Sequence, residues 1–151
     1  MRNTIGQLCN RGVITIGAGA TIAEAARLMR EHHIGALVVA EDGPGGRVPV
    51  GMLTDRDIVV EVVAAGLAPP SIKVGEVVQR AVFSVSEDEG SEDTIRLMAI
   101  KGVRRMPVID SGGRLVGIVT LDDILRHVIG SLTALGDLAE RERRFEAHTR
   151  R

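Results

Sequence analysis

The stretch Gly51-Met52-Leu53-Thr54-Asp55-Arg56-Asp57-Ile58 decides the fold, because it returns later in the chain as Gly117-Ile118-Val119-Thr120-Leu121-Asp122-Asp123-Ile124. Glycine, threonine, aspartate and isoleucine keep their spacing in both copies. In each copy an apolar run rich in β-forming residues ends at the threonine, where a helical pattern begins. The threonine and the aspartate three residues later therefore lie at a strand-to-helix junction. They serve there either as a capping box or as groups that face a ligand.

The matches extend on both sides of these stretches and define a duplication. Arg96-Leu97-Met98 corresponds to Arg27-Leu28-Met29, and Val108-Ile109-Asp110 corresponds to Val39-Ala40-Glu41. Each copy reads as strand, helix, strand, strand, helix. A unit of about 65 residues is marginal alone, so we expect the two copies to pack as one module with clefts between them. The predicted division is a first repeat at 1–66, a connection at 67–73, a second repeat at 74–129 and a C-terminal segment at 130–151.

The C-terminal segment predicts one further amphipathic helix. Leu132, Leu135, Leu138 and Phe145 recur at roughly helical spacing among charged residues. Such a helix either covers the surface of its own module or contacts another subunit or a partner protein.

Composition excludes several classes of function. The 151 residues carry 19 basic and 20 acidic side chains, and this balance lacks the positive excess of a nucleic-acid binder. Phe83 and Phe145 are the only aromatic residues, too few for a platform on which bases stack. The single cysteine, Cys9, forms no internal disulfide and fits a reduced, cytoplasmic setting. No apolar run approaches the roughly 20 residues that span a bilayer, so we expect no membrane partner.

The candidate catalytic and metal-binding groups lack the partners that their chemistry needs. His32-His33 has no third ligand at useful spacing, so we expect no metal site. The carboxylates of Asp55-x-Asp57 and Asp122-Asp123 have no recognisable nucleophile beside them, and Cys9 has no recognisable base. We therefore expect no catalytic residues and no enzyme activity.

The tandem pattern, with each copy ending in Gly-x-x-Thr-x-x-Asp, resembles the cystathionine β-synthase (CBS) domain pair, also called the Bateman module. Besides the two opening stretches, the resemblance rests on Ile34-Gly35-Ala36-Leu37-Val38-Val39 and Val103-Arg104-Arg105-Met106-Pro107-Val108. The first half looks like stand-alone bacterial members of the family. The resemblance implies a mixed α/β (α+β) fold in which two β-α-β-β-α repeats pack sheet to sheet about a pseudo-twofold axis. It also implies a homodimer.

In ligand-binding members of this family, adenine nucleotides occupy the clefts. By position, the resemblance implies that Asp57 and Asp123 bind ribose and that Thr54 and Thr120 lie beside the phosphate. A carboxylate can accept from both hydroxyls of a cis-diol, and first-turn N–H groups favour an anion.

The two implied sites differ in their basic residues. Arg104 and Arg105 suit a phosphate and are assigned to the Asp123 site, whereas the Asp57 site must use Arg56 or an arginine of the other copy. The Asp123 site is therefore expected to be the better one. The implied adenine contacts are Ile14, Ile34 and Gly35 for the Asp123 site, and Phe83 and Val103 for the Asp57 site.

Three hypotheses for the function remain, and the third, an enzyme, lacks recognisable partners for its candidate catalytic groups. The first is a regulatory module that binds AMP, ADP, ATP or another adenosine derivative such as S-adenosylmethionine, and signals to a protein effector by changing its module or dimer packing. In that case the nucleotide is a regulatory ligand, and no cofactor is expected. The second is a scaffold that keeps the fold without binding a nucleotide and acts through its dimer surface and C-terminal helix.

Overall fold

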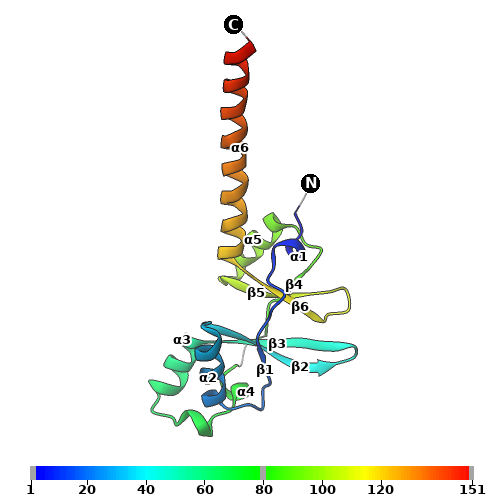
Figure 1. The fold of residues 1–151 in the computed structure, drawn as a ribbon. Coiled ribbons are helices and arrows are strands. Elements are labelled where there is room, and N and C mark those ends of the chain that lie inside the picture. The colour runs from blue at the N-terminus through cyan, green and yellow to red at the C-terminus, as the bar shows by residue number, and fades with distance from the viewer. Residues whose placement is uncertain (1–2, 79–80, 150–151) are drawn as a thin grey trace.

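The computed structural model describes residues 3–78 and 81–149 (Figure 1). Its elements follow in chain order: α1 (Ile5–Leu8), β1 (Thr15–Ile16), α2 (Ile22–His32), β2 (Ala36–Gly43), β3 (Gly46–Thr54), α3 (Asp55–Asp57), the π-helix η1 (Ile58–Val63), the 3₁₀-helix η2 (Pro69–Ser71), α4 (Val74–Val77), β4 (Val85–Ser86), α5 (Ser91–Lys101), β5 (Arg105–Ile109), β6 (Leu115–Thr120) and α6 (Leu121–Thr149).

The strands form two three-stranded sheets of identical topology, one from each repeat. Their orders are β1-β2-β3 and β4-β5-β6. In both sheets the first strand runs parallel to the second, and the second pairs antiparallel with the third. The two sheets contact each other through β3 and β6. The predicted mixed α/β fold with two β-α-β-β-α repeats is confirmed.

Each repeat has its own apolar core, and each core is completed by a short helix from the other repeat. Ile5 of α1 is fully buried in the core of the second repeat. Val74 of α4 is fully buried in the core of the first. The N–H groups of both residues are bound across the repeats as well, since Ile5 donates to the carbonyl of Glu89 and Val74 to that of Ala20, both at 2.8 Å. Either repeat without the other would lack part of its core, which agrees with the expectation that the two copies pack as one module.

The glycine that opens each repeated stretch makes room for the exchanged segment. Gly51 pairs with Val39, and Gly117 pairs with Val108, at the same place in the two sheets. A Cβ on Gly117 would lie 2.6 Å from the sulfur of Cys9, and a Cβ on Gly51 would clash with a methyl group of Val78. The motif glycine is therefore required by packing.

The last helices of the two repeats differ. After Asp57 the first repeat continues as η1, in which Ala64 donates to the carbonyl of Val59 at 2.8 Å, and Gly66 ends the segment at φ 71°. The second repeat instead continues as α6, which has 29 residues and is therefore about 43 Å long.

The predicted C-terminal helix is confirmed, but it is not a separate element. It is the continuation of the helix that begins at Leu121, and it projects away from both repeats (Figure 1). Every residue from 128 to 148 is exposed. The helix therefore does not cover the surface of its own module, which was one of the two alternatives considered from the sequence.

Candidate functional site

Both strand-to-helix junctions form capping boxes. At the first junction the Thr54 N–H donates to Asp57 Oδ2 at 2.8 Å, and the Asp57 N–H donates to Thr54 Oγ1 at 3.1 Å. At the second, the Thr120 N–H donates to Asp123 Oδ2 at 2.9 Å, and the Asp123 N–H donates to Thr120 Oγ1 at 3.2 Å. Each cap engages one oxygen of its aspartate, so the other oxygen is not needed for capping.

The remaining oxygens of the two aspartates have different surroundings. Asp123 Oδ1 lies 3.4 Å from the guanidinium of Arg126. Within residues 3–78 and 81–149, Asp57 Oδ1 has no hydrogen-bond or ion-pair partner. Asp57 is half-buried, so this acceptor is presented from a defined position.

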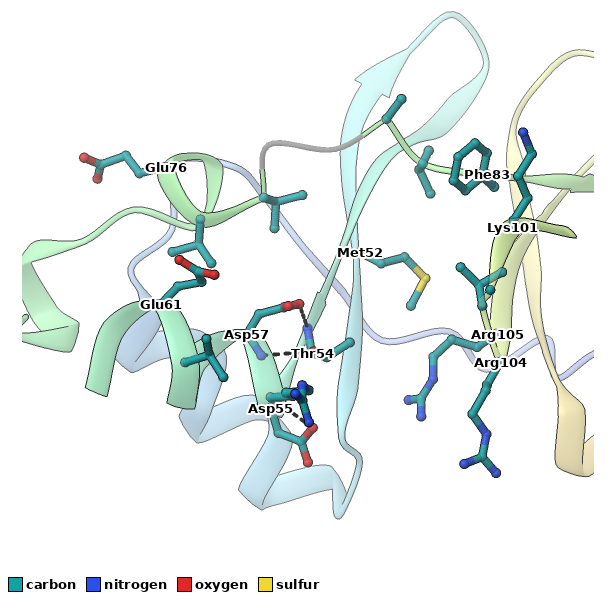
Figure 2. A pocket seen from close by; sticks show the side chains of 18 of the residues that line it. Met52, Thr54, Asp55, Asp57, Glu61, Glu76, Phe83, Lys101, Arg104 and Arg105 are labelled. Carbon is teal, nitrogen blue, oxygen red and sulfur yellow. Dashed lines mark hydrogen bonds between the residues drawn. The ribbon is translucent and has the colours of Figure 1, made fainter. Parts of the chain in front are cut away.

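A cleft of about 1040 Å³ lies between the repeats beside Asp57 (Figure 2). The first repeat contributes one wall from the β3–α3 junction and η1, with Met52, Thr54, Asp55, Arg56, Asp57 and Glu61. The second repeat contributes the facing wall from the segment before β4 and from the end of α5 to the start of β5, with Phe83, Lys101, Val103, Arg104 and Arg105. A ligand in this cleft would touch both repeats at once.

The charges of the cleft are unevenly divided between its walls. Arg104 and Arg105 point from the second repeat into the cleft (Figure 2). Neither guanidinium has a hydrogen-bond or ion-pair partner among the residues that the structure describes. Lys101 stands 4.5 Å above the ring of Phe83 on the same wall. The facing wall holds acidic residues, among them Asp55, Asp57 and Glu61.

The N-terminus of α3 does not offer the free N–H donors that the sequence led us to expect. The Asp55 N–H donates to the carbonyl of Gly35 at 3.0 Å, and the Arg56 N–H donates to Asp55 Oδ1 at 2.8 Å. The N–H of Asp57 is bound in the cap. An anion in this cleft would therefore depend on cationic side chains, namely Arg56 of the first repeat and Lys101, Arg104 and Arg105 of the second.

Seven of the residues predicted from the sequence line this single cleft: Thr54, Arg56, Asp57, Phe83, Val103, Arg104 and Arg105. The sequence assigned Arg104 and Arg105 to the Asp123 site, whereas the structure places them in the lining of the cleft beside Asp57. Their backbone does border the second junction, since the Leu121 N–H donates to the carbonyl of Arg104 at 2.8 Å. Their side chains, however, extend toward the facing repeat.

The residues assigned to an adenine at the second junction serve the first repeat's structure. Ile14 and Ile34 pack against its core. Gly35 adjoins Asp55, whose Oδ2 would lie 3.0 Å from a Cβ at position 35. Ribose and phosphate binding by Asp123 and Thr120, and adenine contacts by these three residues, stay predictions.

Sequence reasoning missed Lys101 and Glu61, both of which line the cleft. Lys101 could have been found from the sequence, because it lies three residues before Arg104 and two before Val103, both of which were predicted as site residues. Glu61 could have been found as well, because it follows Asp57 by four residues, a spacing that places both side chains on the same face of a helix.

Three observations concern the rest of the described residues. Burial raises the pKa of the Cys9 thiol, which packs against the second core. Among the described residues there is no group of three or more His, Cys, Asp or Glu side chains that could hold a metal ion. The described helices include none that is both long and apolar enough to cross a membrane.

A family model described as "CBS domain" matches residues 5–64 and 74–130. The chain belongs to the CBS-domain family. This CBS pair is 43% identical over 125 residues to Hypoxic response protein 1 of Mycobacterium tuberculosis, covering 83% of this chain and 85% of that protein. A crystal structure of Hypoxic Response Protein I with two coordinated zinc ions superposes with a TM-score of 0.72, covering 82% of this chain and 98% of that one.

Two further relatives extend the comparison of this CBS pair. An uncharacterized protein of Methanopyrus kandleri is 37% identical over 123 residues, which are 82% of this chain but 61% of that protein's length. A CBS-domain pair crystallised in complex with 5′-methylthioadenosine and S-adenosyl-L-methionine is 27% identical, with a TM-score of 0.74, covering 87% of this chain and 99% of that one. That relative thus binds adenosine derivatives.

Proposed function

We propose that this CBS pair is a regulatory module that binds an adenine nucleotide in the cleft between its repeats. The observation that carries the proposal is that the two facing walls of that cleft present complementary binding groups. One wall presents the unpartnered Oδ1 of Asp57, and the other presents the unpartnered guanidinium groups of Arg104 and Arg105. A carboxylate accepts from the two hydroxyls of a ribose, and a guanidinium fork donates to a phosphate. The adenosine-bound relative supports this ligand class.

The cleft at Asp57 is the primary site in this proposal. Met52, Phe83 and Val103 supply apolar surface for the base. The cleft is lined by four cationic side chains, which are Arg56, Lys101, Arg104 and Arg105. These are more cations than a single phosphate group would engage. ADP and ATP should therefore bind more tightly than AMP, and S-adenosylmethionine, which has no phosphate, should bind more weakly still.

The ligand would signal by changing how the two repeats pack. Asp57 belongs to the first repeat and Arg105 to the second. A nucleotide that contacts both residues at once would therefore favour one distance between the two repeats. A ligand shifts a conformational equilibrium only by its difference in affinity for the two states. A bridging ligand has such a difference, and a protein effector or a second copy of the chain would sense the shift.

Isothermal titration with adenosine, AMP, ADP, ATP and S-adenosylmethionine tests this function. We expect saturable binding that rises from adenosine to ATP and that Asp57→Ala weakens. Absence of heat with all five ligands would reject nucleotide binding and favour the second candidate, a scaffold that acts through protein contacts. That candidate is supported by α6, on which large apolar residues such as Leu132, Leu135 and Leu138 are exposed.

A further inference from the structure

Helix α6 carries a continuous apolar stripe that is exposed over most of its length. The stripe consists of Leu125, Val128, Leu132, Leu135 and Ala139, and we call it the α6 stripe. Leu132 is 63% exposed and Leu135 is 62% exposed. Two large apolar residues, Ile129 and Leu138, flank it and are exposed as well.

The α6 stripe exposes enough apolar surface to form a protein interface. It extends beyond residue 130, where the match to the CBS family ends, into a part of the helix that no other described residue covers. An isolated helix of this kind is marginal in water, and its stability comes from packing its apolar face. The stripe and its flanking residues expose on the order of 500 to 700 Å², close to the ~800 Å² that each partner buries in a standard interface.

The spacing of the α6 stripe identifies the kind of partner. Its residues follow one another at intervals of three, four, three and four, which is the a and d pattern of a heptad repeat. This pattern packs against another helix with the same pattern, by knobs into holes. The stripe begins on the body of the second repeat at Leu125, so the contact would start where the helix leaves the module.

The charges at the end of α6 favour a second copy of the same helix. Residues 140 to 146 hold three glutamates and three arginines, so this segment has no net charge and does not call for a partner of one sign. Glu140 and Arg144 already form a pair at 3.0 Å within one helix. After Ala139 the heptad positions fall on Glu142 and then on Glu146.

The orientation follows from these last positions. In an antiparallel pair that overlaps the whole stripe, Leu132 lies against Leu135, and Glu142 would lie against apolar Leu125 of the other helix. In a parallel, in-register pair every apolar residue of the stripe meets its own kind. Glu142 then faces Glu142 of the other copy, and Arg143 at the neighbouring heptad position lies beside both carboxylates. We propose that α6 pairs in parallel with α6 of a second copy through the α6 stripe, forming a homodimer with both CBS modules at one end.

Sedimentation equilibrium with a matched pair of variants tests the homodimer. Leu132→Glu places a charge in the stripe, and Thr133→Glu places the same charge one residue further along, off the stripe. We expect the wild type and Thr133→Glu to be dimers at micromolar concentration, and Leu132→Glu to associate at least about 100-fold more weakly. Circular dichroism of all three chains checks that the repeats stay folded. A monomeric wild type, or a dimeric Leu132→Glu, would overturn the proposal.

Disulfide trapping tests the parallel register. In a Cys9→Ala background, Ala139→Cys places one thiol per chain on the stripe, and Asp137→Cys places one on the opposite face. Diamide oxidises two thiols to a disulfide only when their Cα atoms come within about 7 Å. We expect rapid crosslinking of Ala139→Cys and none of Asp137→Cys. A dimer in which Ala139→Cys fails to crosslink would rule out the parallel register.

Discussion

Asp57 accepts the backbone N–H of Thr54 through Oδ2 at 2.8 Å, while its Oδ1 has no partner within the described residues. Structural and binding roles can therefore be separated by substitution. Asp57→Ala should cost about 1 kcal/mol of unfolding free energy through loss of the cap. It should also weaken nucleotide binding about 10- to 150-fold, because charge-assisted bonds worth roughly 1.5–3 kcal/mol are lost. Urea unfolding and isothermal titration measure the two effects.

Asp57→Asn is the informative companion. The amide oxygen of asparagine can still accept the Thr54 N–H, so the variant should keep most of its stability. It should still lose affinity, since the neutral amide cannot give a charge-assisted bond to the ribose. Wild-type affinity in Asp57→Asn would mean that the aspartate caps α3 and does not hold the ligand.

The arginine pair gives a second prediction, on how affinity depends on phosphate and salt. Arg104→Ala combined with Arg105→Ala should reduce ATP affinity far more than adenosine affinity, and should flatten the loss of ATP affinity as salt is raised. Titrations at low and high salt measure both. Arg96→Ala is the matched control, because Arg96 is an exposed arginine of α5 that pairs with Asp93 outside the cleft. Equal losses of adenosine and ATP affinity would contradict a phosphate role.

Local signals in the sequence predicted the elements well. The caps at Thr54 and Thr120 depend on residues three positions apart, and the amphipathic pattern after Leu121 lies within one helix. The pairing of repeats depends on contacts across the whole chain, which no local pattern encodes. The sequence therefore did not predict that Ile5 completes the second core.

The same limit applies to the cleft that Arg104 and Arg105 line. Sequence matching placed Arg104 and Arg105 beside the junction of their own repeat, and their backbone does lie there. The direction of a long side chain depends instead on which repeat faces it across the cleft. The family resemblance implied that two clefts exist, but the cleft that receives these side chains became clear only from the packed structure.

Acid should weaken the fold through Asp110, which gives a third prediction. The guanidinium of Arg114, 2.7 Å away, holds the pKa of Asp110 below its ordinary value of 3.8, with backbone N–H groups helping. Because this pKa is lower in the folded state, the stabilisation is present above the unfolded pKa and is lost as the pH falls through the folded one. Asp110→Asn should therefore be less stable than wild type at pH 7, and the difference should shrink below about pH 4. Urea unfolding at pH 7 and pH 3 measures it, and a constant difference would contradict the assignment.

The contact between Gly51 and Val78 gives the last prediction, a rescue across the exchanged helices. A Cβ at Gly51 would collide with Val78 Cγ1 but would lie 3.6 Å from Val78 Cβ, an ordinary contact. Gly51→Ala alone should cost about 1–3 kcal/mol by overpacking. Adding Val78→Ala removes the colliding methyl, so the double variant should be more stable than the sum of the single effects allows, by at least about 0.5 kcal/mol. Urea unfolding of all four chains completes the cycle. Strict additivity would mean that α4 does not press on β3 in solution, and the exchange of short helices between the repeats would lose its support.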